Sequence, residues 1–107
     1  MTESEFESLA GAALAALESA FEAGVPAADV QAKGEGMLEI EFEDGSKMVI
    51  NRHAAAREIW VAAKSGGFHF RHDGTQWRDT RDGTELFAAI SKLASQQGGT
   101  PVVLAVR

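Results

Sequence analysis

Hydrophobic residues in the first quarter of the chain recur at the spacing of an α-helix. With 3.6 residues per turn, the positions that gather near one face are Phe6, Leu9, Ala13, Leu14, Leu17 and Phe21. The stretch is rich in alanine, which favours helix, and Thr2 or Ser4 can cap its start. Gly24 and Pro26 stop the pattern. The spacing therefore predicts a helix over residues 4–23.

The hydrophobic period changes to two residues further along the chain. Hydrophobic and acidic positions alternate over residues 38–43, which predicts a strand with one buried and one wet face. Asp44 and Gly45 form a turn signal, and a second strand follows. For Met48 and Ile50 to join the buried face, the hairpin loop must have an odd number of residues, with Gly45 at positive φ. A weaker strand is predicted over residues 30–34.

The second half of the chain consists of short segments separated by glycine and aspartate. Residues 58–62, 67–72 and 76–80 are predicted as strands, since such close spacing is typical of an antiparallel meander. Thr84 is the predicted cap of a second helix, which ends at Gly98 and Gly99. Its apolar positions are Leu86, Phe87, Ile90 and Leu93. The apolar tail 101–107 is expected to pack against the core.

The order of elements predicts an α+β fold. Two helices packed on one face of a five- to seven-stranded antiparallel sheet give a two-layer sandwich, and the length of 107 residues is that of a single domain spanning 1–107. The other face of the sheet is then open to solvent, and it is the natural place to look for a binding surface.

Alternation also predicts which side chains the open face displays. If Ile59 and Val61 are in the core, Trp60 points outward, with Glu58 on the same side. The same argument turns Asn51 and His69 outward, so the three side chains can line one surface across adjacent strands. An exposed tryptophan is typical of interface hot spots. The alternative is that the Trp60 ring only covers the sheet. Trp77 is assigned to the core and His53 to a loop.

Charge is divided unevenly along the chain. Residues 1–45 carry eleven acids and one base, a net charge of −10, whereas residues 46–107 carry a net +4. The acidic end should attract cations or a basic protein surface and repel nucleic acid. An acidic face kept for solubility explains the same pattern.

There is no cysteine, no apolar run long enough to span a membrane, and no basic leader segment. A cytoplasmic protein without membrane partners is expected.

Some of these acids gather along one edge of the predicted first helix. Glu7, Glu18 and Glu22 lie within about 60° of one another on a helical wheel. Glu3 lies one turn before Glu7, and Asp29 follows the helix. Exposed carboxylates are hard oxygen ligands that suit Mg²⁺, Ca²⁺, Mn²⁺ or iron, and binding would be weak.

Sequence motifs give no support for catalysis. The chain has no glycine-rich phosphate loop, no nucleophile turn and no pair of a nucleophile with a base. His69 and His72 are predicted to point to opposite faces of a strand, so they cannot chelate a metal together. We expect that the protein is not an enzyme by itself.

Several segments together resemble the bacterial frataxins, and the likeness runs along the whole chain. Trp77, the Asp82-Gly83 turn, Gln96-Gln97 and the opening Ser4-Glu5-Phe6 contribute to it. The strongest segments are Asp44-Gly45-Ser46-Lys47, Ile50-Asn51-Arg52, Ile59-Trp60-Val61-Ala62, Lys64 and Gly66-Gly67-Phe68-His69-Phe70. The resemblance implies the same two-layer fold.

The resemblance also implies a function. Frataxins are small iron-binding proteins of iron–sulfur cluster assembly that associate with the cysteine desulfurase and the scaffold protein. An acidic ridge along the first helix binds iron weakly and docks on the desulfurase; the matching positions here are Glu3, Glu7, Glu18, Glu22 and Asp29. Glu18 and Glu22 are the ridge positions implied in docking, and the sheet positions are Asn51, Arg52, Trp60 and His69.

On this interpretation the protein regulates the assembly complex, and the protein itself carries weakly held Fe²⁺ or Fe³⁺ at its surface. It is expected to be a monomer, and oligomerisation driven by iron is left open. Two alternatives belong to other classes. One is an iron store or ferroxidase, for which the sequence offers no Glu-x-x-His pair on a helix. The other is a generic acidic adaptor whose carboxylates imitate a phosphate backbone.

Overall fold

The structure, a computed structural model, describes residues 1–104. Its first element is the helix α1, Glu3–Gly24, one residue longer at each end than predicted. Thr2 is the N-cap: its side chain accepts a hydrogen bond from the Glu5 backbone N–H, and the Glu5 side chain accepts one from the Thr2 N–H. This reciprocal capping box satisfies two backbone donors that the first turn would otherwise leave free.

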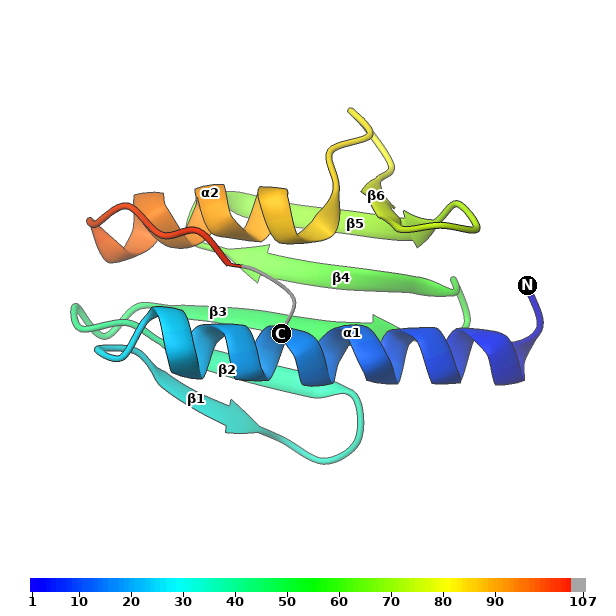
Figure 1. The fold of residues 1–107 in the computed structure, drawn as a ribbon, viewed down its shortest axis with the longest axis horizontal. Helices are drawn as coiled ribbons and strands as arrows, with labels where there is room; N and C mark the ends of the chain where they lie inside the picture. Colours follow the sequence, from blue (N-terminus) through cyan, green and yellow to red (C-terminus); the bar gives the residue numbers. More distant parts are fainter. Residues whose placement is uncertain (105–107) are drawn as a thin grey trace.

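Six strands follow α1 and form one antiparallel sheet in chain order, from β1 at one edge to β6 at the other (Figure 1). Their bounds are β1 Asp29–Ala32, β2 Met37–Glu41, β3 Lys47–His53, β4 Glu58–Ala63, β5 Gly66–His72 and β6 Trp77–Asp79. The predicted meander is thereby confirmed. The β2–β3 loop is odd, as predicted, because Glu41 pairs with Lys47 and leaves five residues between them. Gly45 has a φ of 84°, as that loop requires.

The helix α2, Leu86–Gly98, begins at a different cap from the one predicted. Glu85 is its N-cap, not Thr84: the Glu85 carboxylate accepts hydrogen bonds from the N–H groups of Phe87 and Ala88. A carboxylate there satisfies two free donors and also lies at the positive end of the helix dipole. Gly99 ends the helix with a φ of 78°, a left-handed conformation that glycine adopts without strain.

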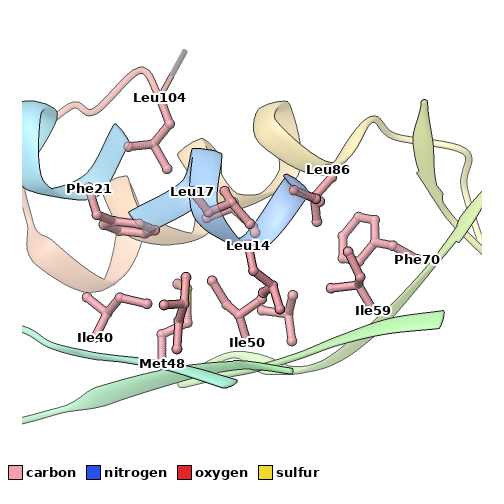
Figure 2. Packing of buried hydrophobic residues seen from close by; sticks show 14 of the residues in the cluster. Leu14, Leu17, Phe21, Ile40, Met48, Ile50, Ile59, Phe70, Leu86 and Leu104 are labelled. Atoms are coloured by element: carbon pink, nitrogen blue, oxygen red, sulfur yellow. The ribbon is translucent and has the colours of Figure 1, made fainter. Parts of the chain in front are cut away.

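Both helices lie on the same face of the sheet, so the predicted two-layer arrangement is confirmed (Figure 1). The core fills the space between the layers, where α1 contributes Leu14, Leu17 and Phe21 and the sheet contributes residues such as Ile50 and Phe70 (Figure 2). Met48, Ile59 and Val61 are buried as the alternation predicted, and so is Trp77. The opposite face of the sheet carries neither helix.

The segment after α2 turns back and runs between the two helices (Figure 1). Ser95 Oγ accepts a hydrogen bond from the Val102 N–H at 2.8 Å, and Ser91 Oγ accepts one from the Leu104 N–H at 2.9 Å. These two serines lie one helical turn apart and hold the segment against α2, so that Leu104 is buried. The tail packs on the core as predicted up to this residue, whereas Val106 lies outside the described residues. Within residues 1–104, no helix is both long enough and apolar enough to cross a membrane.

Candidate functional site

The five carboxylates that we call the acidic ridge (Glu3, Glu7, Glu18, Glu22 and Asp29) are spread along the full length of α1 and onto the start of β1. With a rise of 1.5 Å per residue, about 28 Å of helix separates the first from the fourth. The ridge thus has two groups, one at each end of α1. The second group consists of Glu18 and Glu22, one turn apart, with Asp29 beyond the helix end.

The first group is partly neutralised by a cation from the sheet. Arg52 forms an ion pair with Glu7, its Nη1 lying 2.9 Å from Glu7 Oε2, and its Nη2 lies 3.8 Å from Glu35 Oε2. Arg52 follows Asn51 on β3, so alternation turns it to the helix side of the sheet, away from Asn51. The structure therefore separates two residues that the sequence placed on one partner surface: Arg52 belongs with the ridge.

The second group of the ridge lies near the negative end of the dipole of α1. Glu22 lies in the last turn of α1, which contains no Lys or Arg. The C-terminal end of a helix carries partial negative charge, so a carboxylate is unfavourable there, and Glu18 one turn earlier repels it further. A cation or a basic protein surface placed here would relieve both repulsions.

Metal coordination by the ridge is limited by geometry. Among residues 1–104, no three His, Asp or Glu side chains are grouped closely enough to hold a metal ion. The carboxylates are the ligand type that iron and other hard cations accept, but the arrangement offers a pair of them with the remaining positions left to water. The donor set fits a weak surface site and does not fit an enclosed one.

The outer face, by which we mean the sheet face without helices, carries a stack of three aromatic rings. Trp60 lies between two histidine rings: its centroid is 3.8 Å from that of His53 on β3 and 4.5 Å from that of His69 on β5. The rings are within 10° of parallel. Asn51 pairs with Trp60 in the strand register, and Trp60 pairs with His69, so the predicted row across β3, β4 and β5 is confirmed.

A buried carboxylate lies at the edge of this stack. Glu58 points to the outer face, as predicted, but it is only 6% exposed. Its Oε1 accepts a hydrogen bond from Trp60 Nε1 at 2.9 Å, and its Oε2 accepts one from Arg71 Nη2 at 2.6 Å. His69 Nδ1 lies 3.7 Å from Oε1. Burial by itself would raise the pKa of Glu58, but the hydrogen bonds from Trp60 and Arg71 outweigh it and hold that pKa below its ordinary value.

Sequence reasoning missed two members of this cluster. The prediction that His53 lies in a loop is wrong, because β3 extends through His53 and its ring covers Trp60. The signal was available: His53 is two residues after Asn51, so a longer strand would put both on one face. Nothing in the sequence marked Glu58 as buried, since its cover comes from Trp60, His69 and Arg71 on two strands.

Comparison with known proteins agrees with this architecture. Residues 1–100 match the family model described as the frataxin-like domain. The chain belongs to the frataxin-like family. The resemblance noted from its motifs is thereby confirmed.

Individual relatives within the frataxin-like family cover almost the whole chain. An iron-sulfur cluster assembly protein CyaY from Dechloromonas aromatica is 55% identical over 104 residues, covering 97% of this chain and 99% of the relative. The protein of the same name from a Janthinobacterium species is 56% identical over 108 residues, covering 97% and 96%. A solved structure of frataxin from Psychromonas ingrahamii superimposes with a TM-score of 0.86 at 28% identity, covering 95% of this chain and 96% of that one.

Proposed function

We propose that this protein is an accessory of iron–sulfur cluster assembly. The relatives that share about half of its residues over nearly the full length carry that role in their names. In the proposed mechanism the protein is not itself a catalyst: it docks on the complex of the cysteine desulfurase with the scaffold protein and regulates it. Two surfaces support the docking, the acidic ridge and the outer face.

The observation that carries the docking proposal is the negative charge at the C-terminal end of α1, which no salt bridge pairs within residues 1–104. Glu18 and Glu22 repel each other and the negative end of the helix dipole. A basic patch on the desulfurase would pair with these carboxylates and Asp29, and the summed field would speed the encounter. The other end of the ridge contributes less, because Arg52 already pairs with Glu7.

The outer face would supply the second contact, centred on Trp60. A tryptophan ring that is already ordered loses little conformational entropy on binding, and its flat surface can bury a large area against a partner. Asn51 and His69 flank it with hydrogen-bonding groups. In this arrangement the ridge steers the encounter and the outer face fixes the docked orientation, with the scaffold protein as its partner.

Iron enters the proposal as weakly held cargo at the ridge. We place it at the pair Glu18 and Glu22, with Asp29 adding to the negative field around them, in preference to Glu3 and Glu7, since the Arg52 guanidinium beside Glu7 repels a cation. Addition of Fe²⁺ without oxygen should therefore perturb the amide resonances around residues 18–29 more than those around 3–7. Equal perturbation at both ends would contradict this placement.

The docking mechanism is tested by removing charge from the ridge. We expect the variant Glu18→Gln/Glu22→Gln to bind the purified desulfurase–scaffold complex at least tenfold more weakly near 50 mM salt, and the deficit to shrink at 0.5 M salt, where surface charges are screened. The matched control is Glu35→Gln/Glu43→Gln, which loses the same charge from exposed loop positions outside the ridge. Equal weakening of both variants would show that only net charge matters.

The outer face is tested separately with Trp60→Ala. We expect weaker docking at every salt concentration, because the loss is of packing and not of charge. A buried residue is unsuitable as a control, so the matched variant is Val103→Ala, an exposed apolar residue in the segment after α2, outside the outer face. Undiminished affinity of a folded Trp60→Ala protein would remove the outer face from the interface.

A further inference from the structure

The outer face contains a buried charged group, the carboxylate of Glu58. Glu58 is 6% exposed, yet alternation with the buried Ile59 puts it on the side of the sheet that carries no helix. Removing a carboxylate from water is unfavourable unless hydrogen bonds and opposite charges replace the water. Here they do: the indole N–H and the guanidinium each donate to one of its oxygens, at 2.9 Å and 2.6 Å.

The two kinds of contact made by Trp60 constrain different motions. Stacking between His53 and His69 fixes the plane of the indole ring, but a flip of about 180° around the Cβ–Cγ bond would exchange its two edges and keep it stacked. The hydrogen bond from Nε1 to Glu58 Oε1 removes that freedom, because Nε1 lies on one edge only. Glu58 thus determines which edge of the Trp60 ring lies next to it and which edge points the other way.

The same carboxylate also orients the charged neighbour of the stack. Arg71 is directly opposite Glu58 in the strand register, and its guanidinium is anchored at Oε2 while its side chain remains 66% exposed. Anchoring at one nitrogen leaves other donors of the guanidinium free for an acceptor on a partner. One buried group therefore arranges an aromatic edge and a cation side by side on the outer face.

We propose that Glu58 is a positioning residue for docking: it does not contact the partner but holds Trp60 in the orientation that the partner recognises. This inference rests on the proposed function, since it concerns the docking of the outer face on the desulfurase–scaffold complex. Its energetic basis is preorganisation, because a side chain already held in place need not be ordered during binding.

The inference is tested with two substitutions at one position. Glu58→Leu keeps a side chain of similar size and removes both acceptors, whereas Glu58→Gln keeps one acceptor oxygen for the indole. The control is Glu39→Leu: Glu39 is also a half-buried carboxylate on the outer face, held by Lys33 and Lys47 at 3.4 Å each, and it lies away from the stack. Affinity for the complex and the indole N–H resonance are measured for each variant.

We expect Glu58→Leu to shift the Trp60 indole resonance toward that of a free N–H and to weaken docking about three- to tenfold, the penalty of ordering one or two side chains. Trp77 supplies a second indole resonance in the same spectrum as an internal reference. Glu58→Gln should retain the resonance and restore most of the affinity, and Glu39→Leu should leave both unchanged. An equal loss with Leu and Gln would overturn the inference, since charge and not position would then be responsible.

Two further outcomes separate this inference from the proposed function. If the wild-type protein binds and Glu58→Leu binds equally well despite a shifted indole resonance, the orientation of Trp60 is irrelevant and only the positioning role is refuted. If the wild-type protein does not bind the complex, the proposed function itself is refuted. If Glu58→Leu fails to fold, the positioning role is still tested by comparing Glu58→Gln with Glu39→Leu. A loss of affinity in Glu58→Gln without a shift of the Trp60 indole resonance would refute the positioning role.

Discussion

The charge on Glu22 should make the protein less stable than it would be without it. This residue lies in the last turn of α1, at the negative end of the helix dipole; that turn contains no basic residue, and Glu18 is one turn before it. Substitution of Glu22 by Gln keeps the size and helix propensity of the side chain and removes the charge. We therefore expect Glu22→Gln to raise the free energy of unfolding while it weakens docking.

Two contributions set the magnitude. A surface charge at the unfavourable end of a helix costs about 0.3–1 kcal/mol at low ionic strength. Two like charges four residues apart on a helix cost about 0.2–0.5 kcal/mol more. Glu22→Gln removes both, so the expected gain is roughly 0.5–1.5 kcal/mol, or on the order of 5 °C in Tm for a protein of this size. At 1 M salt, where the Debye length is about 3 Å, most of this gain should disappear.

The assay is urea unfolding followed by circular dichroism at 20 mM and 1 M salt. Glu3 supplies a control at the other end of the same helix: it lies in the first turn, where a carboxylate interacts favourably with the dipole. Glu7, four residues further on, is paired with Arg52, so it repels Glu3 only weakly, and Glu3→Gln should lower the free energy of unfolding by up to about 1 kcal/mol, the opposite sign. If both substitutions changed stability in the same direction, or if the gain from Glu22→Gln persisted at 1 M salt, the dipole argument would be refuted.

Three further predictions concern the framework around the two surfaces. Phe70→Ala, in the fully buried core, should lower the free energy of unfolding by about 3–5 kcal/mol in the same assay. Gly36→Ala should destabilise the protein and disturb the Arg52 side-chain resonances, because φ is 93° there and a Cβ would lie 2.6 Å from Arg52 Nε; unchanged resonances would count against it. Asp73 accepts hydrogen bonds from the backbone N–H groups of Gln76 and Thr75 and from the Arg78 side chain, and these hold the pKa of its carboxyl well below its usual range. Since the folded pKa is depressed, the stabilisation is complete above the unfolded value near 4. It is lost as pH falls toward the folded value, so the stability deficit of Asp73→Asn at pH 7 should narrow below pH 4.

The sequence determined the elements and the faces because both depend on local periodicity. Leu38 and Ile40 alternate with acids, and placing Met48 and Ile50 on the same buried face required an odd hairpin loop with Gly45 at positive φ. Trp60 was assigned to the outer face by the same reasoning, and the frataxin-like motifs pointed to the family that the comparisons show. Element ends were less well determined: Thr84 has the residue type of a cap, but Glu85 is the residue whose carboxylate reaches the first N–H groups of α2.

Only the tertiary structure decided how charged side chains are paired. Arg52 reaches across to Glu7 on α1, a partner 45 positions away that no local pattern identifies, and this pairing distinguishes the two ends of the acidic ridge. Glu58 contacts Trp60 of its own strand and Arg71 and His69 of β5, so its burial depends on the register of β4 with β5. Periodicity fixes the side of an element on which a residue lies, whereas the identity of its neighbours there depends on how distant segments are aligned.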